Sequence, residues 1–138
     1  MDIVYKDFNI LSEDQVKNLY TDAGWTTYTK SIKNLLSGIQ NSDFVYSAWH
    51  ENQLIGLIRV VSDQSTICYV QDLLVLKKYR GQGIGKHLLK TVLEKYKNVR
   101  QIVLITDEDG PIDFYEDMGF ERTNNKHLLA MVKLKKEE

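Results

Sequence analysis

The stretch that decides the fold reads Val75-Leu76-Lys77-Lys78-Tyr79-Arg80-Gly81-Gln82-Gly83-Ile84-Gly85-Lys86. An apolar strand ends here, three glycines alternate, and a strongly amphipathic helix begins. Glycines let successive backbone N–H groups turn toward one point, and a helix N-terminus adds free donors and partial positive charge. Four basic side chains surround the turn: Lys77, Lys78, Arg80 and Lys86. The stretch therefore predicts a socket for a phosphate or pyrophosphate rather than a plain connection.

The spacing of the glycines excludes two common phosphate-binding motifs. A dinucleotide fingerprint has glycines at its first, third and sixth positions, but the sixth residue counted from Gly81 is Lys86. A Walker motif has Gly, four residues and then Gly-Lys-Ser/Thr. Here His87 follows Gly85-Lys86, and Arg80 stands where the first Walker glycine should be. The turn therefore predicts a different phosphate ligand.

On both sides of the turn, the sequence predicts a sheet. Three runs rich in β-branched and aromatic residues precede it and predict an antiparallel meander over 44–49, 54–61 and 66–76. The first two runs flank the four residues His50–Gln53, which predict a hairpin loop. After the turn, apolar residues at helical spacing predict a helix from Ile84 to Tyr96, and Gln101–Thr106 predicts a short strand.

Both ends of the chain add elements to this sheet. Residues 3–8 predict a first strand, Ser12 and Gln15 have capping-box spacing at the start of a helix, and 32–39 predict a second helix. A helix is expected from Pro111 to Met118, followed by closing strands over 120–123 and 127–134. The predicted order is β-α-α-β-β-β-α-β-α-β-β, an α/β (mixed α+β) sheet with helices on its faces.

Composition sets the class of protein. The 138 residues suit a single domain over 1–138, and 43% hydrophobic with 27% charged residues is an ordinary globular balance. A net charge of -1 gives no basic field for nucleic acid, and we find no apolar run near the roughly 20 residues that span a membrane. One cysteine, Cys68, and an N-terminus unlike a signal peptide lead us to expect a cytoplasmic protein. The three histidines lack the spacing of metal ligands, so no metal site is predicted.

Two motifs far apart in the chain point to one family. Arg80, Gly83 and Gly85 form Arg-x-x-Gly-x-Gly directly after an apolar strand, which resembles the pyrophosphate-binding signature of the GNAT superfamily of acyl-CoA-dependent N-acyltransferases. Phe114-Tyr115-Glu116-Asp117-Met118-Gly119-Phe120 is similar to that family's Φ-Tyr-Glu-x-x-Gly-Phe segment. The order of elements matches as well, so the resemblance covers nearly the whole chain and implies the GNAT fold.

The resemblance implies a site for acetyl-CoA. In the family, the strand before the glycine turn splays from its neighbour and pairs with the pantetheine arm. That role falls on Leu74, Val75 and Leu76, with Val75 foremost. Backbone amides of the turn would hold the pyrophosphate, from Arg80, Gly81, Gln82, Gly83, Ile84, Gly85 and Lys86.

Two residues are candidates for catalysis. Tyr115 matches the tyrosine that the family commonly uses as general acid, and a phenol can protonate the departing thiolate; the alternative is a tyrosine packed on the core. Some members use a glutamate on a central strand as base, but Asp72 is the only acid within 66–76. Its alternative role is a structural, hydrogen-bonded aspartate at a strand bulge. The loop 106–110 lacks the asparagine that the family often places there, which leaves its cofactor contacts open.

Two aromatic residues are the candidates for the wall of the acceptor site. Trp25 and Tyr28 occupy the region that walls the acceptor site in relatives, and an aromatic wall beside acidic residues suits a cationic amine; Trp25 could equally be packing core. We expect acetyl transfer to a primary amine by direct attack in a ternary complex, with a small-molecule acceptor favoured over a protein lysine or N-terminus. The alternative function is a non-catalytic acyl-CoA sensor. The resemblance also allows a homodimer.

Overall fold

The computed structural model describes residues 1–135. The chain divides into two compact units, Met1–Leu104 and Ile105–Glu138. The first unit contains the sheet with its helices, and the second contains a short helix and a 3₁₀ turn. A single domain over 1–138 stays a prediction, whereas the mixed α/β fold class is confirmed.

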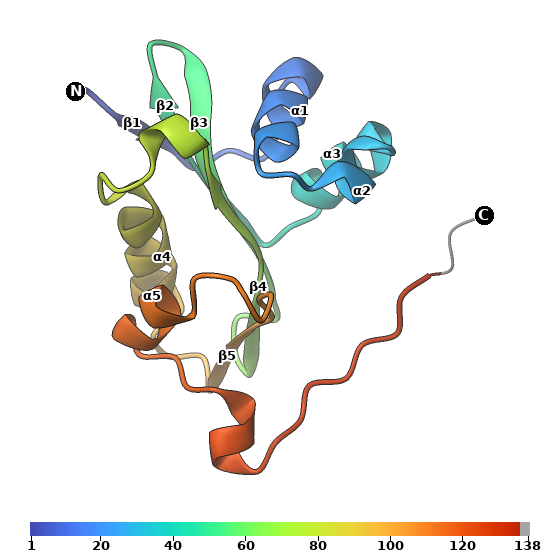
Figure 1. The fold of residues 1–138 in the computed structure, drawn as a ribbon, viewed down its shortest axis with the longest axis vertical. Coiled ribbons are helices and arrows are strands. Elements are labelled where there is room, and N and C mark those ends of the chain that lie inside the picture. Colours follow the sequence, from blue (N-terminus) through green and yellow to red (C-terminus); the bar gives the residue numbers. More distant parts are fainter. Residues whose placement is uncertain (136–138) are drawn as a thin grey trace. The chain divides into compact units, whose positions relative to one another are not determined.

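The sheet has five strands in the order β1-β2-β3-β4-β5, with the first three pairings antiparallel and β4 parallel to β5. The strands are β1 (Val4–Lys6), β2 (Phe44–His50), β3 (Gln53–Ser62), β4 (Ile67–Val75) and β5 (Gln101–Leu104). The predicted meander is confirmed as β2, β3 and β4 (Figure 1). Its first loop is shorter than predicted, because His50 pairs with Gln53 and only Glu51 and Asn52 turn the chain, at φ 49° and 66°. Those left-handed values are typical of a two-residue hairpin turn.

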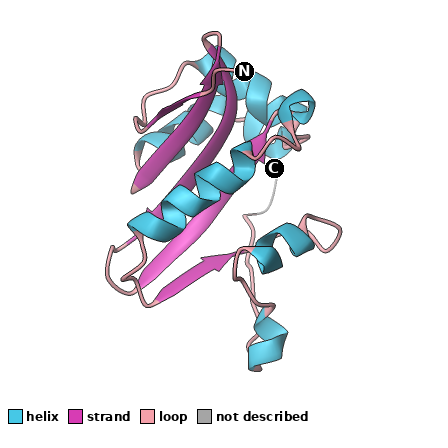
Figure 2. Cartoon of the chain, turned by 90° about the vertical axis from the view of Figure 1, so that its left-hand side faces the viewer, coloured by secondary structure: helices cyan, strands magenta, loops and turns pink. Residues whose placement is uncertain are grey.

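Helices cover both faces of the sheet. One layer consists of α1 (Glu13–Asp22), α2 (Thr26–Thr29) and α3 (Ile32–Gln40), and α4 (Ile84–Lys95) lies on the other side (Figure 1). Figure 2 shows α4 in front of the sheet, running obliquely in the same general direction as the strands. The helical turn α2 lies in the connection between α1 and α3, where the sequence predicted no helix. Each layer buries apolar residues against the strands, among them Leu19 of α1 and Leu88 and Val92 of α4, because their spacing places them on one helix face.

The start of α1 follows the prediction only in part. The Ser12 hydroxyl accepts a hydrogen bond from the Gln15 N–H at 3.2 Å, so the cap is formed. The Gln15 side chain does not close the capping box. Its amide group instead donates to the Asn52 carbonyl at 3.1 Å and accepts from the Leu54 N–H at 3.0 Å. These two bonds tie the first turn of α1 to the β2–β3 hairpin.

The second unit contains α5 (Ile112–Asp117) and the 3₁₀ turn η2 (Thr123–Lys126). Pro111 precedes α5 as its N-cap, and Gly119 follows its C-cap with φ 99°, a conformation typical of a glycine that ends a helix. The prediction of closing strands over 120–123 and 127–134 is not met: within residues 105–135 the structure has no strand. A strand forms only when a neighbour pairs its backbone groups, and the apolar side chains of 128–134 stay largely exposed, Met131 at 87%.

Candidate active site

The end of β4 extends beyond its parallel neighbour. Residues 67–70 of β4 pair with 101–104 of β5, and residues 71–75 continue past the end of β5. On the other side β4 stays paired with β3, where Val75 lies opposite Gly56. Within residues 1–104, this leaves one edge of β4 without a strand partner from Gln71 to Val75. An extended amide chain can add to such an edge by backbone hydrogen bonds.

The glycine turn has the backbone conformation that its sequence predicts. The 3₁₀ turn η1 (Lys77–Tyr79) leads into it, and Gly81 and Gly83 have φ values of 81° and 82°. A Cβ at either glycine would meet nothing within 4 Å among the described residues. The left-handed backbone thus accounts for both glycines, and open space lies over the turn.

The third glycine has a different basis. Gly85 lies in the first turn of α4, outside the residues with positive φ. Gly83 is the N-cap of α4, and in the described part of the chain no side chain caps this end of the helix. The first amides of α4 therefore remain donors for a ligand. A glycine at position 85 is compatible with a ligand that approaches the backbone closely.

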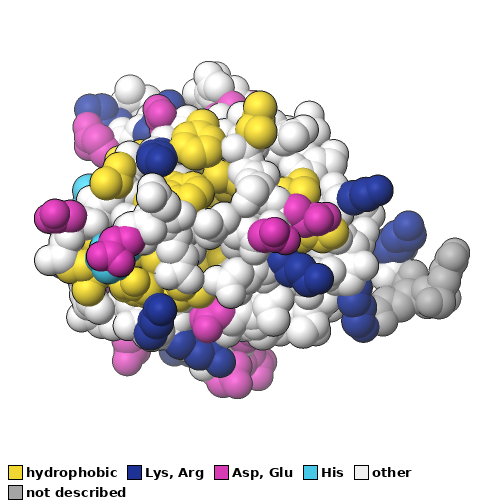
Figure 3. Space-filling model, turned by 90° about the horizontal axis from the view of Figure 1, so that it is seen from above, with side chains coloured by type: hydrophobic (Ala, Val, Ile, Leu, Met, Phe, Trp, Pro, Cys, Tyr) yellow, Lys and Arg dark blue, Asp and Glu magenta, His cyan; other side chains and the backbone are white. Residues whose placement is uncertain are grey.

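Charge and burial divide the turn into an anchored part and an exposed part. The Ile84 side chain is buried at 3%, while Gly81 to Gly83 are exposed. Lys77, Lys78 and Lys86 are exposed, and the Arg80 Nε donates to the Val75 carbonyl at 3.1 Å. Exposed acidic and basic side chains are interspersed on the face seen in Figure 3. Positive charge at the turn is therefore local, in agreement with a net charge of -1.

Asp72 lies in a buried network. Its side chain is 1% exposed, and its Oδ2 accepts hydrogen bonds from the Arg59 Nε and from the Tyr20 hydroxyl, the latter at 2.8 Å. The register of β3 and β4 shifts at Arg59, so Asp72 stands at a bulge. Two donors compete with any substrate amine for this oxygen. The geometry favours the structural role for Asp72 over that of general base.

The two aromatic residues predicted at the acceptor site lie next to this network. The rings of Trp25 and Tyr28 pack on Tyr20, with centroids 5.8 and 5.6 Å from it. The Tyr28 hydroxyl accepts a hydrogen bond from the Gln71 side chain at 2.6 Å, and the Arg59 guanidinium lies 6.0 Å from the Tyr28 ring centre. Burial raises the pKa of Tyr28. The Tyr28 ring of this aromatic wall thus contacts a cation of the protein itself, the Arg59 guanidinium.

Sequence reasoning missed Arg59 and Tyr20. Arg59 is the only charged residue in the otherwise apolar stretch 54–61, and Asp72 is the only acid in the next strand. Two lone, opposite charges in neighbouring strands of a meander are a signal for a buried pair, because neither is buried without a partner. Tyr20 carries no comparable signal, since its helical spacing groups it with the apolar residues Val16 and Leu19 on the buried face of α1.

Tyr115 belongs to the second unit. It is half-buried on α5, and its ring packs edge-to-face on Phe114 and Phe120 at centroid distances of 5.2 and 6.0 Å. Burial raises the pKa of Tyr115 above its ordinary value of 10.0. Its phenol is therefore protonated at neutral pH, the state required of a proton donor.

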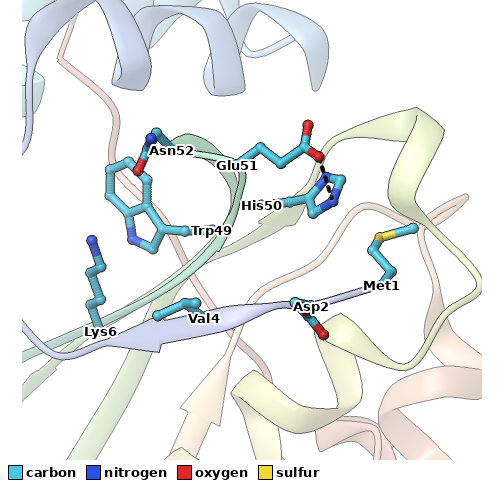
Figure 4. A pocket seen from close by; sticks show the side chains of 8 residues that line it. All are labelled: Met1, Asp2, Val4, Lys6, Trp49, His50, Glu51 and Asn52. Atoms are coloured by element: carbon cyan, nitrogen blue, oxygen red, sulfur yellow. Dashed lines mark ion pairs between the residues drawn. The ribbon is translucent and has the colours of Figure 1, made fainter.

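A separate hollow lies between β1 and the β2–β3 hairpin, with a volume of about 500 Å³. Figure 4 shows Lys6, Trp49 and His50 around it, with His50 Nε2 3.9 Å from a carboxylate oxygen of Glu51. The residues predicted to hold the cofactor do not line it. Over the described residues there is no group of three metal-ligating side chains and no helix long and apolar enough to cross a membrane.

Comparison with known proteins gives matches to acetyltransferases. The family model of the acetyltransferase (GNAT) domain matches residues 9–134. The structure of a GNAT family acetyltransferase from Streptococcus pneumoniae TIGR4 is 33% identical, covers 99% of this chain and 100% of that chain, and has a TM-score of 0.85. "Uncharacterized N-acetyltransferase ycf52" of Gracilaria tenuistipitata var. liui is 28% identical over 85% of this chain and 66% of its own length. A PaiA N-acetyltransferase from Thermoplasma acidophilum, in complex with coenzyme A, shares the fold at 18% identity, 88% and 91% coverage, and TM-score 0.73.

The chain belongs to the GNAT acetyltransferase family. The family match spans residues of both units, and the identification made from Arg80, Gly83 and Gly85 is thereby confirmed. The domain is of the acetyl-transferring acyltransferase class, and the Thermoplasma acidophilum protein that shares its fold was solved in complex with coenzyme A. The chain spans about two thirds of the length of the curated relative described above.

Proposed function

We propose that this protein binds acetyl-CoA along the free edge of β4 and at the glycine turn, and transfers the acetyl group to a primary amine. The observation that carries the proposal is the combination of a strand edge free of β5 with open space over Gly81 and Gly83. The strand edge suits the amide groups of pantetheine, and the amides at the start of α4 suit the pyrophosphate.

Transfer proceeds by direct attack in a ternary complex. Holding the amine against the thioester supplies much of the rate acceleration without a covalent intermediate. Tyr115 donates a proton to the leaving thiolate, and burial keeps that proton on the phenol at neutral pH. Asp72 stays a candidate base from the sequence, but its bonds to Arg59 and Tyr20 support a positioning role at the bulge.

The acceptor in this proposal is a small-molecule amine rather than a protein lysine or N-terminus. Support comes from the wall formed by Trp25 and Tyr28, which is closely packed on Tyr20 and fixed by the Gln71 side chain. A fixed aromatic wall suits a compact substrate.

The proposed location is the cytoplasm, whose reducing environment agrees with the single, buried Cys68. A homodimer stays a prediction.

The test is a pair of measurements on the same preparation. Titration calorimetry with acetyl-CoA measures cofactor binding, and release of free thiol is followed across a panel of small amines, a lysine-containing peptide and a peptide with a free N-terminus. We expect cofactor binding and turnover with at least one small amine. Turnover with peptides alone contradicts the acceptor class. Cofactor binding with no turnover on any amine favours the sensor, and no binding by folded protein overturns the proposal.

A further inference from the structure

A carboxylate from α1 caps the turn that precedes the glycines. Asp22, the last residue of α1, accepts a hydrogen bond at its Oδ2 from the Lys77 N–H at 2.8 Å. Lys77 is the first residue of η1, and Leu76 before it has an apolar side chain that cannot cap the turn. The donor at the start of η1 is therefore satisfied by a residue 55 positions away in the chain.

The position of η1 determines where the backbone amides that would bind the cofactor pyrophosphate begin. The Tyr79 N–H donates to the Leu76 carbonyl at 2.9 Å and the Arg80 N–H to the Lys77 carbonyl at 3.3 Å, which closes the turn directly before Gly81. The Leu76 N–H also donates to the Ile55 carbonyl of β3 at 2.8 Å. The Leu76 N–H therefore connects the start of η1 to the sheet, and Asp22 connects it in addition to helix α1.

The Tyr79 side chain gives η1 a third support. Its hydroxyl shares a hydrogen bond of 2.7 Å with His50 Nδ1, at the end of β2. Asp22 and Tyr20 both belong to α1, and Tyr20 bonds Asp72 on β4. Helix α1 therefore contacts the β4 bulge through one side chain and the start of the glycine turn through another.

We propose that Asp22 is a positioning residue for cofactor binding, which holds η1 so that the amides from Arg80 onward face the pyrophosphate. This inference rests on the proposed acetyl-CoA site. Asp22 acts through its acceptor oxygen and not through its charge, because a carboxylate beside an anion site opposes the binding of an anion. An asparagine has the same acceptor without the charge, so the two contributions can be separated.

The experiment compares Asp22→Ala, Asp22→Asn and the exposed-acid control Asp7→Ala with the wild type. KM for acetyl-CoA, KM for the amine, kcat and the midpoint of thermal unfolding are measured for each. For Asp22→Ala we expect KM for acetyl-CoA to rise about five- to tenfold, the usual effect of one lost hydrogen bond, with kcat within about twofold. Asp22→Asn should stay within about twofold of the wild type or bind the cofactor more tightly.

A second pair of variants removes the donor instead of the acceptor. Lys77→Pro deletes the N–H, and the ring fits because position 77 opens a 3₁₀ turn and Leu76 already has ψ 138°. Lys77→Ala is its control for the lost charge. Relative to Lys77→Ala, Lys77→Pro should raise KM for acetyl-CoA by as much as Asp22→Ala raises it relative to the wild type. Combining Lys77→Pro with Asp22→Ala should raise this KM no further.

The outcomes separate this inference from the proposed function. If the wild type binds no acetyl-CoA, the proposed function fails first. If the wild type binds and Asp22→Ala keeps its KM for acetyl-CoA, or Asp22→Asn is impaired as much as Asp22→Ala, Asp22 has no positioning role. Equal losses in kcat and both KM values, with a lower unfolding midpoint, would show a general structural defect and also overturn the inference.

Discussion

Arg59 and Asp72 stand opposite each other where β3 and β4 change register, and the Arg59 Nε donates a hydrogen bond to Oδ2 of Asp72. Both side chains are buried, at 8% and 1% exposure. Arg59 also donates to the Ser42 hydroxyl at 3.3 Å. Burial and the Asp72 carboxylate raise the pKa of Tyr20 well above its ordinary value, so the Tyr20 hydroxyl stays a donor to Asp72.

Removing either partner of this pair should destabilise the protein strongly. Asp72→Leu leaves the Arg59 guanidinium buried without its counter-ion, and Arg59→Met leaves the Asp72 carboxylate buried without its counter-ion. We therefore expect each variant to lower the free energy of unfolding by about 3–5 kcal/mol. Urea unfolding monitored by circular dichroism measures this. The double variant Arg59→Met with Asp72→Leu should be more stable than either single variant, because no charge is left unpaired. A single variant that loses less than about 1 kcal/mol would contradict a buried ion pair.

The sequence predicted the backbone of the glycine turn better than it predicted the second unit. The glycine turn follows from the positive φ that Gly81 and Gly83 require, a local property that a sequence reveals directly. The bulge at Asp72 was predicted only as the alternative to a catalytic role, and the partner of Asp72 across it, Arg59, depends on the register of two strands. The sequence therefore reveals a local backbone conformation more directly than it reveals which distant residues pair.

The segment after α5 shows the opposite case. Residues 127–134 are rich in apolar residues and predict a strand by composition, but the structure has none within the described part of that segment. Instead η2 forms at Thr123–Lys126 through local hydrogen bonds, and His127 takes a left-handed conformation, φ 58°. β-propensity measures how well a side chain suits a paired, half-buried surface. It cannot supply the partner strand.

Substitution of the glycines should separate backbone strain from obstruction of the cofactor. Gly83→Ala places a side chain at φ 82° and should lower the free energy of unfolding by about 1 kcal/mol or more. Gly85→Ala lies in the first turn of α4, where alanine is the better helix former, and should keep or raise stability by up to about 1 kcal/mol. Both should weaken acetyl-CoA binding in calorimetry. If Gly85→Ala binds the cofactor like the wild type, the amides of α4 do not approach the pyrophosphate closely.

The buried cysteine should take no part in catalysis. Burial, with a smaller contribution from Asp43, raises the pKa of Cys68 from 9.0 to about 11. At pH 8 the thiolate fraction is then about 100-fold below that of a free thiol, and labelling with a disulfide reagent should be at least that much slower than in unfolded protein. Cys68→Ala should keep its turnover number within about twofold. A loss of turnover in a variant that still folds and binds the cofactor would point to an acyl-cysteine intermediate.

The same shift gives a stability prediction with a definite sign. The folded-state pKa of Cys68 lies above its unfolded value, so folding favours the protonated thiol. Its contribution to stability is present below about pH 9 and is lost as the pH rises through about 11. Between pH 8 and pH 11, urea unfolding should therefore show a smaller loss of stability for Cys68→Ala than for the wild type. An equal loss in both proteins would mean that the thiol is not what is titrating.

Replacement of Tyr115 by phenylalanine tests the proton donor. Tyr115→Phe keeps the ring that packs on Phe114 and Phe120, so folding and acetyl-CoA binding should be unchanged. Turnover should fall about 10²-fold, the lower range for loss of a general acid. Phe114→Tyr, which adds a hydroxyl beside it, is the matched control and should not restore activity to Tyr115→Phe.

The pH profile gives Tyr115 a signature that a packing role does not. Because burial raises its pKa above 10.0, Tyr115 holds its proton throughout neutral and mildly alkaline pH. Wild-type kcat/KM for an amine should rise with pH as the amine deprotonates, and should fall only when the pH passes the raised pKa of Tyr115. That alkaline fall should be missing in Tyr115→Phe. A profile that declines already between pH 8 and pH 9, or an alkaline fall that survives in the variant, would assign the proton to another group.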